Sequence, residues 1–278
     1  MLLPGALGPL LRTWGAAYAD PQVPAAVAVV IPTILRPSLA RALASVFAQQ
    51  FGGRIQVLIG IDQPQGPMEL LEAACAMAPP QCLVQALYPG YSTSVRHGGL
   101  WAARDGGALR TILSYLANAP LIAYLDDDNW WGPNHLATLA RAIEPVDWAF
   151  SLRWFVHPET ARPVCIDQWE SVGPEAGIFR ERFGGFVDPN CLMIKRPNCD
   201  PVLPVWTMPL AGDTKGMSAD RNIFAFLSKH RSCAGTGEAS TFYLLDPTDG
   251  LHPQRMQSMG EHYPSAGAHP IGQEPRVT

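Results

Sequence analysis

Short apolar blocks alternate with amphipathic segments along the first half of the chain. The apolar blocks, which suit strands covered on both faces, are residues 27–31, 55–61, 82–87 and 121–125. Apolar residues recur at helical spacing in segments 39–47, 68–78, 109–119 and in one that starts at Pro133. This alternation predicts an α/β fold with a mixed, mainly parallel sheet flanked by helices.

The pattern changes after residue 147, where isolated strand-like runs lie among many Pro and Gly residues. The runs are 148–155, 190–195 and 241–245, and an amphipathic helix is expected at 218–230. These features predict a smaller mixed or antiparallel region that shapes a pocket.

Four segments follow from these changes of pattern. They are an N-terminal extension (1–26), the two halves of one domain (27–146 and 147–255) and a tail (256–278). Residues 2–19 are apolar with only Arg12 charged, which predicts a short packed helix; peripheral membrane contact is the alternative. Large apolar residues become sparse after Asp246, so part of the tail is expected to lack fixed order.

Composition excludes several classes of protein. The chain has 20 Lys and Arg residues and 24 Asp and Glu residues, which gives a net charge of −4. Without an excess of positive charge the protein would not be attracted to a polyphosphate backbone, so we expect no nucleic-acid partner. The six cysteines form no C-x-x-C pair, which argues against a zinc site or a disulfide framework. No run approaches the roughly 20 apolar residues of a membrane span, and the start lacks the basic residues of a signal peptide. We therefore expect a soluble, cytoplasmic protein.

Three adjacent carboxylates, Asp126, Asp127 and Asp128, follow the apolar block at 121–125. Like charges at a strand end raise one another's pKa values unless a cation neutralises them. On an extended chain Asp126 and Asp128 would share one face while Asp127 points away. Carboxylate oxygens select hard divalent cations such as Mg²⁺ or Mn²⁺, and ligands of open α/β sheets bind at this edge. The alternative is a solvated turn that favours the next helix start.

Several separated motifs flank this acidic cluster in a fixed order. They are Val29-Val30-Ile31-Pro32-Thr33, Arg36-Pro37, Ser45-Val46-Phe47-Ala48-Gln49, Ile61-Asp62 and Ile122-Ala123-Tyr124-Leu125-Asp126-Asp127-Asp128-Asn129. In order and spacing they resemble the family 2 glycosyltransferases, over roughly residues 27–255. The resemblance implies a GT-A fold of Rossmann-like type and an enzyme that uses a nucleotide-diphospho-sugar.

The resemblance also implies residues that hold the donor nucleotide. Thr33 and Asp62 would hold the nucleoside, because a carboxylate can accept a hydrogen bond from a uracil or guanine ring N–H. The family has an arginine that approaches the nucleotide. Its spacing from Asp126 matches Arg110, whereas the residues around Arg104 look more like the family's motif, and we prefer Arg110. Its neighbours Thr111 and Leu113 replace the Asn and Gly that the family shows there. The alternatives are a plain turn residue at 62 and solvated arginines on a helix.

The same resemblance assigns the acidic cluster and a distant histidine. Asp126 would bind the ribose or sugar, Asp128 would ligate the cation that bridges the diphosphate, and Asp127 would assist on the donor side. Many relatives take a third metal ligand from a histidine after the last strand, for which His252 is the candidate; an exposed loop histidine is the alternative.

Inverting relatives need a general base, usually the aspartate of a Glu-Asp pair that begins a late helix. Asp220 fits this place best, although Ala219 stands where the family often has Glu. Asp213, in the segment 210–216, is the competing candidate. A helix-start aspartate favoured by the helix dipole is the structural alternative for Asp220.

Aromatic and polar residues near these motifs have two interpretations each. Trp130, Trp131 and Trp206 could stack on a sugar ring, although packing is the commoner role of tryptophan. Asp188 and Asn190 could contact sugar hydroxyls, although turn residues around Pro189 are the simpler interpretation.

The sequence and its family resemblance therefore predict a metal-dependent, inverting glycosyltransferase that uses Mn²⁺ or Mg²⁺. This enzyme would move a sugar from a nucleotide diphosphate to an unidentified hydroxyl acceptor. The resemblance indicates UDP as the nucleotide. One alternative is a nucleotide-sugar or carbohydrate-binding protein without turnover, which the departures at Thr111, Leu113 and Ala219 favour. A sugar nucleotidyltransferase is the third; residues 31–38 lack the Gly- and Arg-rich loop of such enzymes.

Overall fold

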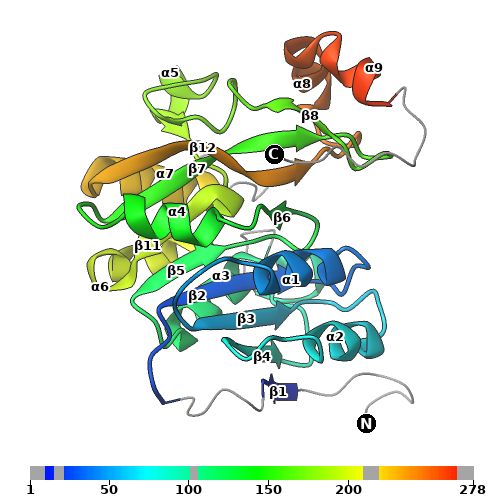
Figure 1. The fold of residues 1–278 in the computed structure, drawn as a ribbon, viewed down its shortest axis with the longest axis vertical. Coiled ribbons are helices and arrows are strands. Elements are labelled where there is room, and N and C mark those ends of the chain that lie inside the picture. The colour runs from blue at the N-terminus through cyan, green and yellow to red at the C-terminus, as the bar shows by residue number, and fades with distance from the viewer. Residues whose placement is uncertain (1–9, 16–21, 101–105, 209–218, 268–278) are drawn as a thin grey trace.

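A ten-stranded mixed sheet runs through the centre of the molecule (Figure 1). The structure is a computed structural model that describes residues 10–15, 22–100, 106–208 and 219–267. The strand order is β1-β4-β3-β2-β5-β11-β7-β12-β6, with β8 paired to β7. The strands are β1 (Leu10–Trp14), β2 (Val27–Thr33), β3 (Ile55–Ile61), β4 (Cys82–Tyr88), β5 (Leu121–Tyr124), β6 (Trp130–Trp131), β7 (Trp148–Val156), β8 (Pro163–Ile166), β11 (Leu192–Lys195) and β12 (Cys233–Leu244). A separate hairpin joins β9 (Gly173–Pro174) to β10 (Gly185–Phe186).

Helices cover both faces of this sheet. The α-helices are α1 (Leu39–Phe47), α2 (Met68–Cys75), α3 (Gly107–Leu116), α4 (His135–Ala142), α5 (Arg180–Phe183), α6 (Arg196–Cys199), α7 (Ala219–His230), α8 (His252–Met259) and α9 (His262–Gly267). Short 3₁₀ helices are η1 (Val95–His97), η2 (Pro189–Cys191) and η3 (Asp200–Thr207). None of the helices in the described ranges is long and apolar enough to span a bilayer.

The parallel part of the sheet confirms the expectation drawn from the apolar blocks. Strands β4, β3, β2 and β5 lie side by side and parallel, so their carboxyl ends meet at one edge. Beyond β5, β11 pairs antiparallel with both β5 and β7, and β12 then pairs parallel with β7. The predicted mixed α/β class is thus confirmed, with the change of pattern after residue 147 marking the mixed region.

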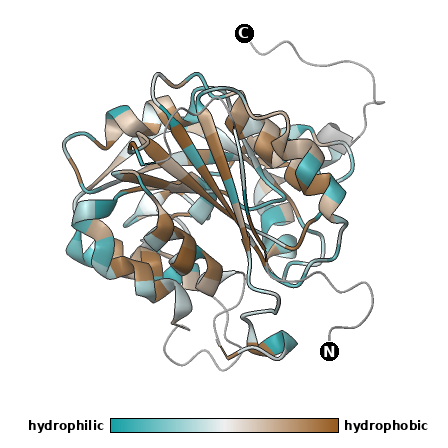
Figure 2. Ribbon diagram, turned by 90° about the horizontal axis from the view of Figure 1, so that it is seen from below, coloured by the Kyte–Doolittle hydropathy of each residue, from teal (hydrophilic) through white to brown (hydrophobic). Residues whose placement is uncertain are grey.

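Alternate residues of β2 build the two halves of the core. Val27, Val29 and Ile31 pack with α1, α2 and α4, whereas Ala28 and Val30 pack with α3, η3 and α7. All five are fully buried. Figure 2 shows the hydrophobic strands enclosed between helices on two sides. Burial on both faces explains why this strand has no polar alternation in the sequence.

The expectation of a packed helix in the N-terminal segment is wrong over the residues that the structure describes there. Residues 10–14 of this segment form the strand β1, which pairs antiparallel with β4. This pairing satisfies backbone groups that β4 would otherwise leave free at the sheet edge. At the other end of the chain, Met256 and Met259 of α8 pack against Phe155, Tyr243 and Leu245, and the expectation that part of the tail lacks fixed order stays a prediction.

Candidate functional site

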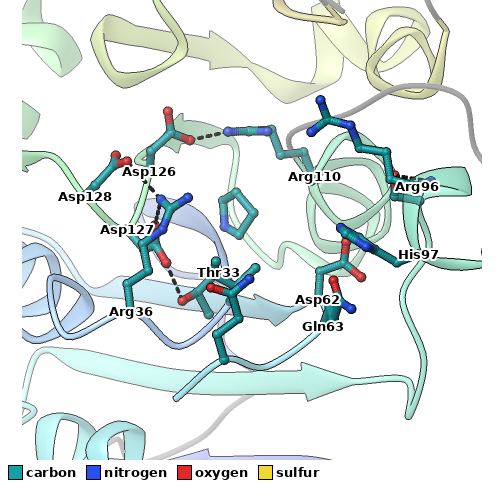
Figure 3. Close-up of a pocket in the computed structure, with 15 residues that line it drawn as sticks. Thr33, Arg36, Asp62, Gln63, Arg96, His97, Arg110, Asp126, Asp127 and Asp128 are labelled. Atoms are coloured by element: carbon teal, nitrogen blue, oxygen red, sulfur yellow. Dashed lines mark hydrogen bonds and ion pairs between the residues drawn. The ribbon is translucent and has the colours of Figure 1, made fainter. Parts of the chain in front are cut away.

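A cavity of about 410 Å³ opens at the carboxyl ends of the parallel strands (Figure 3). Loops after β2, β3, β4 and β5 and the start of α3 contribute to it. Its lining residues are Pro32, Thr33, Ile34, Arg36, Asp62, Gln63, Gln65, Ser94, Arg96, His97, Gly106, Arg110, Asp126, Asp127 and Asp128. The cavity therefore collects six of the eight residues that the sequence singled out for donor, metal or base roles.

The acidic cluster lies on a turn immediately after β5. The expectation that Asp126 and Asp128 share one face while Asp127 points away is wrong, because alternation holds only on an extended strand and β5 has already ended. Asp127 and Asp128 instead converge on Arg36, and Asp126 faces Arg110 (Figure 3). Three carboxylates are thus matched locally by two guanidinium groups.

Asp127 is the most enclosed member of the cluster. Thr33 Oγ1 donates a hydrogen bond to its Oδ2 (2.6 Å), and Arg36 Nη1 lies 2.9 Å from its Oδ1. Thr33 Oγ1 also accepts from the backbone N–H of Leu35 at 2.8 Å, which fixes the loop after β2. Burial raises the pKa of Asp127, and the bonds to Thr33 and Arg36 oppose that rise. The Thr33 hydroxyl is therefore used to orient a carboxylate.

Asp128 is more accessible, with 42% of its side chain exposed. Arg36 Nη1 lies 2.9 Å from its Oδ2, and Asn129 Nδ2 donates to its Oδ1 at 3.0 Å. Burial and repulsion from Asp126 and Asp127 raise the pKa of Asp128 to about 7, against the attraction of Arg36. An additional cation here would relieve repulsion that the single guanidinium leaves in place.

Asp126 is held from two sides. Arg110, from α3, forms an ion pair with its Oδ1. Asn190 bonds it twice: its Oδ1 accepts from the Asp126 backbone N–H (2.6 Å), and its Nδ2 donates to Asp126 Oδ2 (2.9 Å). Arg110 is itself nearly buried and lies over the Trp206 ring, 5.2 Å from the ring centroid. The side chain of Asp126 is consequently oriented before any ligand arrives.

Asp62, after β3, lies on another wall of the cavity. Its Oδ1 accepts a hydrogen bond from the backbone N–H of Thr93 at 3.0 Å, which ties the loop after β4 to the end of β3. This loop brings Arg96 and His97 to the cavity, across from Asp128 (Figure 3). The acidic cluster, paired with Arg36 and Arg110, therefore forms one wall of the cavity, the acidic wall, and Asp62, Arg96 and His97 lie on the other side (Figure 3).

Two predicted residues do not line the cavity. Asp220 lies in the first turn of α7, where its Oδ1 accepts from the Arg221 backbone N–H at 2.8 Å. His252 begins α8, and its ring centroid is 6.0 Å from that of Tyr263. The alternative candidates Arg104 and Asp213 lie outside the described residues.

The tryptophans have packing roles in the structure. Trp131 is buried and stacks on His135, with ring centroids 4.3 Å apart. Trp206 is buried against Tyr124. Trp130 is partly exposed and stacks on Phe242 while the Arg41 guanidinium lies 3.8 Å from its ring centroid. Of the three, Trp130 alone is partly exposed.

A buried ionic cluster supports the acidic wall from behind. Asn190 Nδ2 donates to Asp188 Oδ1 (2.6 Å), and the other oxygen of Asp188 accepts from Arg153 Nη1 (2.5 Å). Arg153 is fully buried and also binds Asp167 (2.9 Å) and Glu170 (2.8 Å). Asp188 and Asn190 thus link Arg153 to Asp126 through hydrogen bonds. In the structure they are not turn residues exposed to solvent.

Glu170 extends this cluster to the C-terminal helices. Arg255 of α8 binds both oxygens of Glu170, at 2.8 and 3.1 Å, and binds Asp249 at 2.7 Å. The ring of Tyr243 lies between the two guanidinium groups, 4.1 Å from that of Arg153. The residues of this cluster are far apart in the sequence, and no local sequence motif predicts that they meet.

Sequence analysis gave no role to Arg36, Arg96, His97, Gln63 or Ser94, although all line the cavity. Arg36 belongs to the Arg36-Pro37 motif that follows the first strand, but the motif carried no assigned role for its side chain. Its position three residues beyond Thr33 was the available signal. Gln63 lies in the loop after β3, and Ser94, Arg96 and His97 lie at or within the short helix η1, where spacing carries little information.

The carboxylates partly fit a divalent cation. No group of three or more His, Cys, Asp or Glu side chains suited to holding a metal occurs within the described ranges. However, Asp127 Oδ1 and Asp128 Oδ2 lie at equal distances of 2.9 Å from one Arg36 nitrogen, so two hard oxygen ligands already converge on a cation. Mg²⁺ commonly takes one or two carboxylates and completes its shell with water and substrate phosphate. These residues therefore fit an ion that a diphosphate helps to bind.

Comparison with known proteins identifies the fold. No protein-family model and no curated relative matches the chain. Among solved structures, S. aureus TarS 1–349 in complex with UDP is 13% identical, with a TM-score of 0.55 over 80% of this chain and 61% of that chain. The complex of the same protein with UDP-GlcNAc is 11% identical, with a TM-score of 0.55 over 85% and 66%.

The mannosyltransferase PcManGT from Pyrobaculum calidifontis, in complex with GDP-Man and Mn²⁺, is 14% identical, with a TM-score of 0.52 over 92% of this chain and 67% of that one. The chain spans less than two thirds of the length of the TarS structure with UDP. At these identities the likeness concerns the fold: the chain has a glycosyltransferase fold.

Proposed function

We propose that the protein is a metal-dependent, inverting glycosyltransferase of the family 2, GT-A type, which transfers a hexosyl group from a nucleotide-diphospho-sugar to a hydroxyl acceptor. The observation that carries the proposal is the cavity at the carboxyl ends of β2, β3 and β5, lined by Thr33, Asp62, Arg110 and the acidic cluster. Open α/β sheets bind ligands at this edge. Structural neighbours of the same fold hold UDP, UDP-GlcNAc and GDP-Man.

The walls of the cavity suit the parts of such a donor. We assign the nucleobase to the Asp62 side, because a carboxylate accepts from the ring N–H of uracil. Arg110 is the nearest guanidinium to Asp126 and would face the diphosphate, while Asp126, held by Asn190, would accept from ribose or sugar hydroxyls. We take UDP as the nucleotide by resemblance and by the TarS complexes.

Asp128 is the proposed protein ligand of Mn²⁺ or Mg²⁺, with Asp127 beside it and His252 as the further ligand that the sequence predicts. When bound, the ion would offset the negative charge that develops on the departing nucleoside diphosphate. Asp127 and Thr33 would keep the acidic turn in place, because their hydrogen bond is short and buried.

Asp220 is the proposed general base. It would remove the proton of the acceptor hydroxyl, whose oxygen attacks the anomeric carbon while the bond from that carbon to the diphosphate oxygen breaks. Its place in the first turn of α7 favours the ionised carboxylate that a base requires. Asp213 is the next residue to test.

A thermal-shift series tests donor binding. UDP and UDP-sugars should stabilise the protein, and Mn²⁺ should enlarge the shift, because a ligand of the folded state stabilises it by mass action. Asp128→Ala should abolish the manganese-dependent part of the shift, whereas Asp246→Ala, at an exposed carboxylate outside the cavity, should keep it. An unchanged shift in Asp128→Ala would reject Asp128 as the ligand.

Turnover separates an enzyme from a binding protein. We expect Asp220→Asn to keep the UDP shift and to lose sugar transfer. Full transfer by this variant would move the base elsewhere. Donor binding by the wild type without transfer or donor hydrolysis would favour the binding protein, an alternative consistent with the position of Asp220 outside the cavity lining.

A further inference from the structure

Arg36 already acts as a cation for the two carboxylates that the proposed ion would use. A single nitrogen, Nη1, lies 2.9 Å from Asp127 Oδ1 and 2.9 Å from Asp128 Oδ2. The other oxygen of each carboxylate is held by a neutral donor, the Thr33 hydroxyl or the Asn129 amide. The oxygens that face Arg36 are therefore the pair available to another cation.

Arg36 is the solvent-accessible partner in this arrangement. Its side chain is 46% exposed, whereas that of Asp127 is 4% exposed. The backbone before Arg36 is fixed: Leu35 is fully buried with a positive φ of 63°, and its N–H is bonded to Thr33 Oγ1. The guanidinium can consequently leave by side-chain rotation, while the loop and the carboxylate stay in place.

Two cations cannot occupy the space between the same oxygens. An ion that ligates Asp128 on this side must displace Arg36, and the displaced guanidinium then needs an anion. The diphosphate of a donor is such an anion, and guanidinium groups bind phosphates in bidentate fashion. Release of Arg36 to a diphosphate would thus lower the cost of binding the ion.

We propose that Arg36 is a built-in competitor of the divalent ion, which keeps ion affinity low until a nucleoside diphosphate takes over its guanidinium. The proposal rests on the proposed function, since it assumes that Asp128 is an ion ligand. On this proposal the divalent ion and the diphosphate each increase the affinity of the protein for the other. By thermodynamic linkage the two affinities increase by the same factor.

The test is Mn²⁺ binding to the full chain, measured by the electron paramagnetic resonance signal of free Mn²⁺, with and without UDP. Arg36→Met should bind Mn²⁺ alone at least about tenfold more tightly than the wild type, because a unit charge about 4 Å from a divalent ion repels it by more than this factor even with the screening of bulk water. UDP should then tighten Mn²⁺ binding by a smaller factor in this variant than in the wild type.

Arg41→Met is the matched control. Arg41 carries the same charge near Asp128, but it donates to the Asp128 backbone oxygen (3.2 Å) and stacks on Trp130 without touching the carboxylates. Its removal should change Mn²⁺ affinity by less than that of Arg36. An equal gain in both variants would reduce the effect to net charge and overturn the proposal.

Equal or weaker Mn²⁺ binding by Arg36→Met would also overturn the proposal, as would the absence of Mn²⁺ binding in every variant. These outcomes differ from failure of the proposed function, which is judged on the UDP shift. If UDP fails to bind but Arg36→Met tightens Mn²⁺, the competition stands and the donor assignment falls.

Discussion

Two arginine–carboxylate clusters in this molecule have similar chemistry and opposite surroundings. At the cavity, Arg36 bridges Asp127 and Asp128 with 46% of its side chain exposed. Behind it, Arg153 binds three carboxylates with none of its side chain exposed. The first cluster lies in the parallel half of the domain, at strand ends that open to a ligand, and the second lies in the mixed half.

The difference concerns which partners can be exchanged. A half-exposed ion pair contributes little to stability, so another cation can replace its arginine at low cost. A buried arginine cannot leave, because the carboxylates around it would remain desolvated and unpaired. The open cluster is therefore suited to ligand binding, whereas the closed cluster is suited to holding the open one in position through Asp188 and Asn190.

The largest expected effect comes from breaking the closed cluster. Arg153→Met should lower the free energy of unfolding by about 3–5 kcal/mol, because it leaves buried acids without their partner. Urea unfolding at neutral pH measures this loss. Arg36→Met is the matched variant in the open cluster and should lose less than Arg153→Met, because Asp128 is partly exposed and Asp127 keeps its hydrogen bond from Thr33. Similar losses in the two variants would remove the distinction between the clusters.

A smaller effect is expected where the two clusters are joined. Asn190→Ala should cost about 1–3 kcal/mol, because the part-buried Asp126 N–H loses its hydrogen bond and Asp188 Oδ1 keeps only the bond from the backbone N–H of residue 190. It should also reduce the thermal shift by UDP, since Asp126 would no longer be oriented. Asn198→Ala, at an exposed amide that donates to Asp147, is the control and should change neither quantity much. A full UDP shift in Asn190→Ala would show that the hydrogen bonds linking the two clusters are unimportant for UDP binding.

The smallest effect concerns pH, and the two clusters should differ in sign. The pKa of Asp128 is raised to about 7 in the folded state, whereas the pKa of an ordinary aspartate is about 4. Between these two pH values the folded state therefore holds more protons than the unfolded state. The contribution of Asp128 to the free energy of unfolding therefore falls as pH rises through this interval. In Asp167, burial acts to raise the pKa, but Arg153 and three backbone N–H groups lower it. Its contribution is lost as pH falls.

Asp128→Asn tests this sign in the presence of a chelator. The variant should match the wild type near pH 4 and become more stable than it by pH 8, by less than about 1 kcal/mol because the exposed side chain is screened by solvent. Melting temperatures across this range measure the difference. A variant that is less stable than the wild type at pH 8 would contradict the raised pKa.

Sequence predicted best those features that local pattern determines. Strand β3 was predicted with its observed bounds, because burial on both faces leaves an unbroken apolar run, and the place of Asp126, Asp127 and Asp128 follows from the end of such a run. The long strand β12 was predicted only over its end, since its first residues, Cys233–Gly237, include small residues and Gly that also suit a loop.

Long-range pairing escaped prediction. Arg153 meets Glu170, and Glu170 meets Arg255, across 17 and 85 residues of chain. Each of these side chains, taken alone, is typical of a solvated surface. Only the tertiary fold brings them together, and nothing in their spacing distinguishes them from other charged residues. The bridge from Arg36 to the acidic cluster, across 91 and 92 residues, was missed for the same reason.

The most direct test of the central claim is a crystal structure of the protein with UDP and Mn²⁺. We expect the diphosphate in the cavity between Arg110 and Asp128, the ion at roughly 2.1 Å from an Asp128 oxygen, and Arg36 turned away from that carboxylate. UDP bound away from the cavity and from all three acids would contradict the account.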